Sequence, residues 1–224
     1  MTIQRTISPV DGSVYVERTL AVPAQIEAAL ESARLAQRAW RAVPMAERSA
    51  ILSHFCDAFE LHGEAIAEEL SWQMGRPIRF APSEVRGTLE RARHMIAIAP
   101  EALADIDVGP KAGFHRFLRR EPLGVVFTVA AWNYPYLIAV NSVVPALMAG
   151  NVVVLKHSAQ TPPCAERFEQ CLSEAGLPEG AFQALHLSHA DTERVIRDPR
   201  VDFVAFTGSV AGGHAVQRAA ADRF

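Results

Sequence analysis

The sequence has little cysteine, and its cysteines form no paired motif. Cys56, Cys164 and Cys171 are an odd number without a CxxC pair, which is typical of unpaired thiols in a reducing compartment. No apolar run approaches the roughly 18 residues that a membrane span requires. The first residues, MTIQRTISPVDGS, lack the apolar core of a signal peptide. We therefore expect a cytoplasmic protein that does not enter a membrane.

An excess of charge of one sign is also absent. The chain has 22 Lys and Arg against 25 Asp and Glu, and the two signs are interspersed, so nucleic acid is not expected as a partner. His186 and His189 lack the neighbouring ligands that a metal site needs, and no metal is predicted. With 50% hydrophobic residues in 224 positions, the composition is that of a globular protein able to bury a core.

Helical periodicity dominates the first half of the chain, up to about Gly113. Apolar residues recur at helical spacing over residues 23–42, 45–62, 64–74 and 83–104. Short β-prone pieces at 13–20 and 114–120 flank these helices. We expect a helical region with short strands over residues 1–113, followed by a connecting strand over 114–121.

After Pro122 the pattern changes to strands that alternate with helices. The expected strands cover residues 124–130, 151–156, 182–187 and 201–206, and the expected helices cover 136–149, 162–175, 191–197 and 211–221. The runs GVVFTVAA and NVVVL lack alternation, as expected for strands covered on both faces. Residues 122–224 are therefore predicted to form a Rossmann-like parallel α/β sheet with flanking helices. Its ligand crevice should lie at the carboxyl ends of the strands.

Three of the expected strand ends carry residues suited to binding a cofactor. These are Ala131, Trp132 and Asn133 after the first strand, Lys156, His157 and Ser158 after the second, and Gly208, Ser209 and Gly213 in a turn before the last helix. Because the carboxyl ends of parallel strands meet at one edge of the sheet, all three groups should project into one crevice.

The glycine-rich turn is the expected anion site. Backbone N–H groups and the helix dipole attract phosphate at a helix start. Gly208 and Gly213 are spaced as in a Walker A loop, but His214 and Ala215 replace the required Lys and Ser/Thr, and no GxGxxG is present. An ordinary turn from strand to helix remains the alternative.

Lys156 stands where dinucleotide-binding folds often hold an acidic residue for the ribose 2′-hydroxyl. A cation there, with His157 and Ser158, could accept a 2′-phosphate, which favours NADP over NAD. The alternative is a solvated surface lysine, which is the commoner environment for this residue type.

In order along the chain, these segments resemble the NAD(P)-dependent aldehyde dehydrogenase family. The matching motifs are Ala131 to Pro135, Leu155 to Ala159, Phe206 to Ser209, Met74-Gly75-Arg76-Pro77 and Glu121-Pro122-Leu123-Gly124. The resemblance implies that Asn133 helps to hold the oxyanion formed when a cysteine attacks an aldehyde. A fixed neutral donor of this kind typically contributes about 10² to 10³ in rate. An amide that only caps a turn is the alternative for Asn133. Ala159 stands where many members carry a Glu that grips ribose hydroxyls, which again favours NADP.

The family's general-base Glu and catalytic Cys belong to segments that follow the last helix expected here. The resemblance therefore implies the N-terminal half of a subunit without its catalytic domain, and this chain alone is expected to be inactive. Its three cysteines are interpreted as structural thiols. The resemblance also implies an aldehyde substrate and a homo-oligomer, with residues 114–121 leading to its oligomerisation region. The alternative is a non-catalytic dinucleotide-binding or assembly protein.

Overall fold

A four-stranded parallel sheet lies at the centre of the computed structural model, which describes residues 2–222. Its strands are β5 (Val125–Val129), β6 (Val152–Lys156), β7 (Phe182–Ala184) and β8 (Phe203–Phe206), in the order β7-β6-β5-β8. The predicted α/β class with a parallel sheet is thereby confirmed. All residues of β5 and β6 are buried, because these two apolar strands are the central pair of the sheet.

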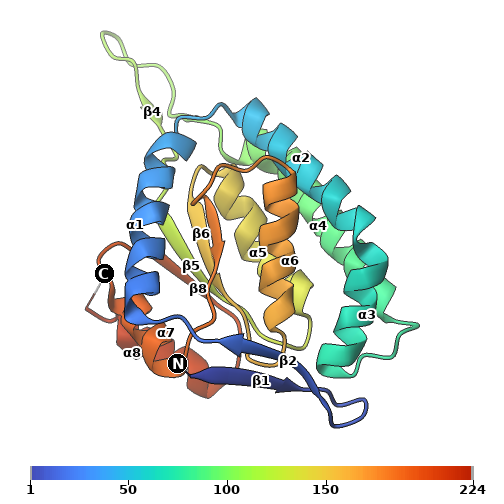
Figure 1. Ribbon diagram of the computed structural model, residues 1–224. Coiled ribbons are helices and arrows are strands. Elements are labelled where there is room, and N and C mark those ends of the chain that lie inside the picture. The colour runs from blue at the N-terminus through green and yellow to red at the C-terminus, as the bar shows by residue number, and fades with distance from the viewer. Residues whose placement is uncertain (1, 223–224) are drawn as a thin grey trace.

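Helices cover both faces of this sheet (Figure 1). One face packs against α1 (Pro23–Trp40), α7 (His189–Arg197) and α8 (Val210–Ala220). The other face packs against α5 (Pro135–Met148) and α6 (Pro162–Glu174), with α2 (Met45–Leu61), α3 (Gly63–Met74) and α4 (Ala81–Ala102) in the same core. Alternate residues of each strand serve the two faces: Val152 and Val154 face the α1 side, while Val153 and Leu155 face the α5 side.

The helices begin where the sequence offers start signals. Pro23 occupies the first turn of α1, and the side chains of Ser188 and Ser209 accept backbone N–H groups at the starts of α7 and α8. The α3 helix ends at Gly75, whose φ of 73° is readily adopted by glycine. These signals explain why the predicted helices agree with the observed ones to within a few residues.

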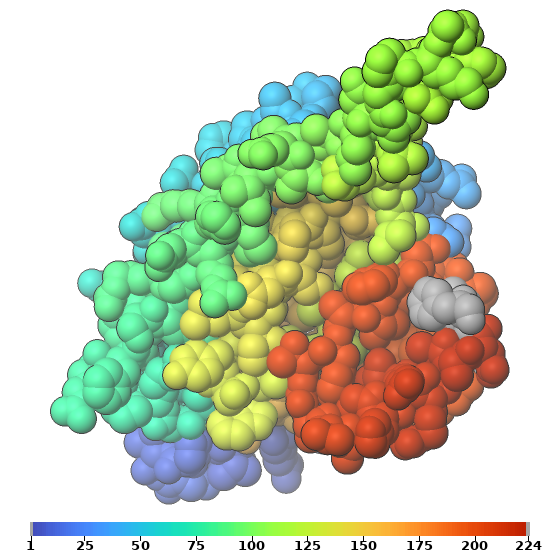
Figure 2. Space-filling model, turned by 180° about the vertical axis from the view of Figure 1, so that it is seen from behind, coloured from blue at the N-terminus to red at the C-terminus, as the bar shows by residue number. Residues whose placement is uncertain are grey.

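Two antiparallel strand pairs lie outside the main sheet. The first joins β1 (Ile3–Ile7) to β2 (Val14–Thr19), and the second joins β3 (Ile106–Asp107) to β4 (Phe117–Leu118). The second pair forms a hairpin that projects from the rest of the molecule (Figure 2). Strands β1 and β3 were not predicted, and the predicted strand over 114–120 is reduced to two residues. These short strands are largely exposed, so no buried apolar pattern marks them.

The helical region and the α/β region share one hydrophobic core. Phe55 and Phe59 of α2 form an aromatic cluster with Tyr136 of α5 and Phe168 of α6, and the ring centroids of neighbouring members are 5.2 to 6.0 Å apart. The predicted boundary near residue 113 therefore separates two patterns of secondary structure that pack together. Within residues 2–222, no helix combines the length and apolarity that crossing a membrane requires.

Candidate functional site

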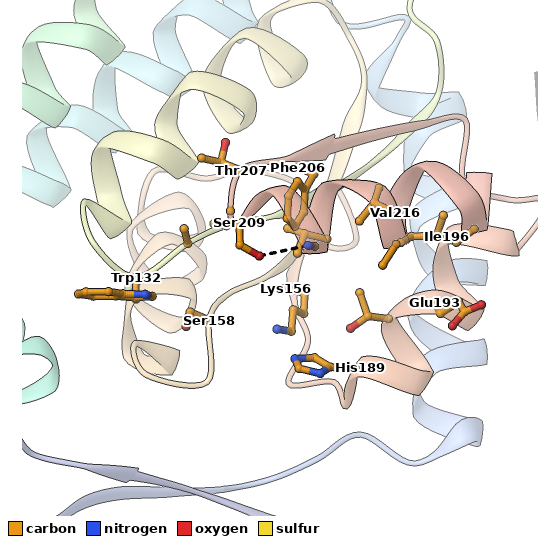
Figure 3. A pocket seen from close by; sticks show the side chains of 18 of the residues that line it. Trp132, Lys156, Ser158, His189, Glu193, Ile196, Phe206, Thr207, Ser209 and Val216 are labelled. Carbon is orange, nitrogen blue, oxygen red and sulfur yellow. Dashed lines mark hydrogen bonds between the residues drawn. The ribbon is translucent and has the colours of Figure 1, made fainter. Parts of the chain in front are cut away.

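A cleft of about 1110 Å³ opens at the carboxyl ends of β5, β6 and β8. Its walls come from the segment after β5, from the end of β6, from α7, and from the turn between β8 and α8 (Figure 3). Of the nine residues predicted to form a site, seven line it: Ala131, Trp132, Asn133, Lys156, Ser158, Gly208 and Ser209. Segments that are about 75 residues apart in the sequence thus meet here, because parallel strands end at one edge of the sheet.

Lys156 is the buried cation of this cleft. It is the last residue of β6, only 7% of it is exposed, and its amino group points into the cleft (Figure 3). Burial lowers the pKa of this amino group. No hydrogen bond or ion pair to the side chain is found among the residues that the structure describes. A buried cation without a protein partner is costly, so an anionic ligand would compensate it.

His157, which was predicted to bind the cofactor together with Lys156 and Ser158, does not line the cleft. Its Nδ1 accepts the backbone N–H of Ser158 at 3.0 Å and lies 2.9 Å from Thr161 Oγ1, and its Nε2 lies 3.3 Å from the carbonyl oxygen of Pro135. Burial lowers its pKa to about 4, so the ring is neutral near pH 7. His157 links the end of β6 to the start of α5 and adds no charge to the cleft.

The turn between β8 and α8 has the geometry of an anion site. Ser209 is the N-cap of α8, and its Oγ accepts the backbone N–H of Gly212 at 3.1 Å. The N–H groups of the first helical turn have no partner within a helix, and the helix dipole adds positive potential there. The start of α8 faces the same cleft as Lys156.

The glycines of this turn make room for an aromatic ring. A Cβ atom at Gly208 would lie 2.6 Å from Phe206 Cζ, and one at Gly212 would lie 2.8 Å from the same atom. Gly213 does not line the cleft; its N–H donates to Ser209 O at 2.9 Å, and a Cβ there would make an ordinary contact. Of the two glycines predicted in this turn, the structure thus brings Gly208 to the cleft and leaves Gly213 outside it.

Comparisons with known proteins identify the family of the chain. The model of the family described as "Aldehyde dehydrogenase family" matches residues 2–224. The chain belongs to the aldehyde dehydrogenase family. It is 33% identical over 220 residues to a succinate-semialdehyde dehydrogenase [NADP(+)] from Mycobacterium avium, covering 97% of this chain and 47% of that protein.

Two solved aldehyde dehydrogenase structures have the same fold. One is a succinic semialdehyde dehydrogenase from Streptococcus pyogenes in complex with NADP+, with a TM-score of 0.92, 28% identity, and coverage of 98% of this chain and 48% of that one. The other is an NAD-dependent benzaldehyde dehydrogenase from Corynebacterium glutamicum, with a TM-score of 0.91, 30% identity, and coverage of 98% and 47%. The chain thus spans about half the length of these aldehyde dehydrogenases, whose cofactors are NADP for one and NAD for the other.

The α7 helix also contributes residues to the cleft, and these residues were not predicted from the sequence. His189, Thr192, Glu193 and Ile196 line one wall. Their spacing of three and four residues places them on one helix face, which is the signal that could have indicated them. His186, in contrast, lies outside the cleft and pairs with Glu166 at 3.0 Å.

None of the cysteines lines the cleft. All three are buried, and burial raises the pKa of Cys56 to about 11, that of Cys171 to about 12, and that of Cys164 well above its ordinary value. Thiols in this state are poor nucleophiles at neutral pH. Within residues 2–222, no three His, Cys, Asp or Glu side chains gather as a metal site would require.

Proposed function

We propose that this chain forms the nicotinamide-dinucleotide-binding part of an enzyme that oxidises an aldehyde to a carboxylic acid, with NADP favoured over NAD. The buried and unpartnered Lys156 carries the proposal. An acidic residue at the end of this strand would suit a ribose 2′-hydroxyl, whereas a cation suits a 2′-phosphate. Family membership supports the reaction class. Because the similar proteins include both NADP-dependent and NAD-dependent enzymes, the preference for NADP is inferred from Lys156 and not from them.

The residues present fit such a cofactor. Lys156 and Ser158 would hold the 2′-phosphate, and the start of α8 with Ser209 would hold the pyrophosphate. When bound, the nicotinamide supplies the hydride acceptor. Asn133, at the same cleft, would donate its side-chain amide to the developing oxyanion of the aldehyde.

The nucleophile would not come from the thiols described here, because they are buried and their pKa values are raised. We therefore infer that this chain alone is inactive. A homo-oligomeric state and a cytoplasmic location remain predictions that belong to the same proposal. The alternative, a non-catalytic dinucleotide-binding or assembly protein, would bind the cofactor without aldehyde oxidation by the complete gene product.

The test uses the two lysines of the sequence, Lys111 and Lys156. Lys156→Met removes the cleft cation at similar volume, and Lys111→Met, between β3 and β4, is the matched control. Calorimetric titration should show tighter binding of NADP+ than of NAD+ to the unmodified chain. A charge-assisted hydrogen bond contributes about 1.5–3 kcal/mol, so Lys156→Met should weaken NADP+ binding roughly 10-fold to 100-fold. NAD+ binding should change much less, and Lys111→Met should change neither.

Equal weakening for both dinucleotides in Lys156→Met would remove the argument for the 2′-phosphate. Failure of the unmodified, folded chain to bind either dinucleotide would overturn the assignment of the cleft itself.

A further inference from the structure

An ion pair outside the cleft holds the segment that carries Asn133. Arg76, which follows α3, pairs through Nη1 with Oε2 of Glu84 in the first turn of α4. The Glu84 side chain is fully buried, and the Arg76 side chain is 10% exposed. Neither residue lines the cleft. A buried pair is not by itself a source of stability, so the contacts that it makes elsewhere are informative.

The second carboxylate oxygen of Glu84 accepts hydrogen bonds from the start of another helix. Its Oε1 accepts the backbone N–H groups of Tyr136 at 3.0 Å and Leu137 at 3.5 Å, in the first turn of α5. The N-cap of α5, Tyr134, offers no side-chain hydrogen bond to this turn. Glu84 therefore caps α5 from a distant part of the chain, and its charge also suits the positive end of the helix dipole.

The guanidinium of Arg76 reaches the segment just before α5. Its Nη2 donates to the carbonyl oxygen of Asn133 at 2.7 Å, and its Cζ lies 4.4 Å from the centre of the Tyr134 ring. Within residues 2–222, this is the only hydrogen bond found from any side chain to residues 131–134. These residues otherwise have little to fix them, since Trp132, Asn133 and Tyr134 are exposed.

We propose that Arg76 and Glu84 are positioning residues that fix the backbone of Asn133, so that its amide is held at the cleft before any ligand binds. This inference rests on the proposed function of Asn133. A donor whose position is already fixed needs no reorganisation when charge develops on a substrate. Arginine suits this role because two separate nitrogens of its planar group reach Glu84 and the carbonyl oxygen of Asn133, whereas lysine would have to reach both acceptors from one nitrogen.

Selective labelling tests this directly, because the sequence has three asparagines, Asn133, Asn141 and Asn151. With 15N-asparagine, only three backbone amide signals appear. Asn141 and Asn151 are internal controls, since their side chains donate to Leu137 O at 2.8 Å and to Ala146 O at 3.2 Å. The Asn133 signal can be assigned by its loss in Asn133→Asp.

In the unmodified chain, Asn133 should have the backbone order parameter of a rigid segment, about 0.85, and in Arg76→Lys this should fall below about 0.6. Asn141 and Asn151 should keep their values. The matched control is Arg167→Lys, which alters a partly buried ion pair with Glu69. The hydrogen bonds of Arg167 go to Glu69 and Gln170 and none goes to residues 131–137, so this variant should leave all three signals unchanged.

The double variant Arg76→Met with Glu84→Gln removes both charges and leaves no unpaired buried ion, so it keeps the fold testable if a single variant unfolds. A rigid Asn133 in either folded variant would overturn the proposal, and so would a mobile Asn133 in the unmodified chain. The measurement needs no cofactor. Its outcome is therefore independent of whether the chain binds NADP+.

Discussion

His157 should make the stability of the chain fall as the solution becomes mildly acidic. The ring is 4% exposed, and burial lowers its pKa to about 4, against about 6.5 in an unfolded chain. Between these values the unfolded state binds the proton and the folded state does not, so stability is full above about pH 6.5 and is lost as the pH falls toward 4.

The size of the effect follows from this difference in pKa. At a pH where His157 is protonated in the unfolded state but neutral in the folded state, the free energy of unfolding can fall by at most about 3 kcal/mol, because one pKa unit is about 1.36 kcal/mol. Between pH 7 and pH 5, the loss attributable to His157 is about 2 kcal/mol. Folded domains have only about 5–15 kcal/mol of stability in total, so this loss is readily measurable.

Urea unfolding at pH 7, 6 and 5, followed by tryptophan fluorescence, would measure it. His157→Gln, which cannot take up a proton, should be the less stable protein at pH 7 but should lose about 2 kcal/mol less than the unmodified chain on going to pH 5. His94→Gln removes an exposed ring of α4 and should follow the unmodified chain. Glu166, whose pKa is lowered to about 2, loses its contribution only below about pH 4.5 and so does not confuse the result. Parallel curves for His157→Gln and the unmodified chain would refute this reasoning.

Two further predictions concern the start of β5 and the thiols. Gly124→Ala should destabilise the chain by roughly 2–4 kcal/mol in chemical unfolding. Gly124 has a φ of 135°, and a Cβ atom at this position would lie 2.0 Å from Asp202 Oδ2. A loss of stability below about 1 kcal/mol would contradict the steric argument. The three cysteines should not react with Ellman's reagent in the folded chain at pH 8, because they are buried and their pKa values are raised. All three should react once guanidinium unfolds the chain. Rapid labelling of the folded chain would show that a thiol is accessible and would contradict this prediction.

The sequence was sufficient to predict the sheet and most of the cleft, because burial on both faces leaves a clear mark. The apolar strands β5 and β6 were predicted nearly to their ends, and the residues that follow them reach the cleft as expected. Strands β1 and β3 were missed because pairing with a neighbour, rather than burial, gives them their structure.

The position of His157 outside the cleft has a geometric cause. Lys156 and His157 are adjacent, and adjacent residues at a strand end point to opposite faces of the sheet. Lys156 follows the alternation of Val152 and Val154 toward α7 and α8, whereas His157 follows Val153 and Leu155 toward α5. Grouping both residues in one site ignored this alternation.

Glu84 was missed for a different reason. An acidic residue in the first turn of a helix is usually interpreted as favouring that helix's own start. Its hydrogen bonds to the start of α5 cross 52 and 53 positions in the sequence, and only the packing of α4 against α5 brings them together.

The shared aromatic core also bears on how this protein could be divided by engineering. Dinucleotide-binding folds are often treated as modules that can be cut out and grafted. Here, Phe55 and Phe59 of α2 pack directly on Tyr136 and Phe168, and Thr6 Oγ1 of β1 donates to the carbonyl oxygen of Ala159 at 2.9 Å, close behind Ser158. A fragment beginning at residue 122 would expose that aromatic surface and release the segment behind the cleft. The smallest unit that could be transferred intact is therefore nearly the entire chain, and the dinucleotide binding proposed here should not survive removal of the N-terminal strands and helices.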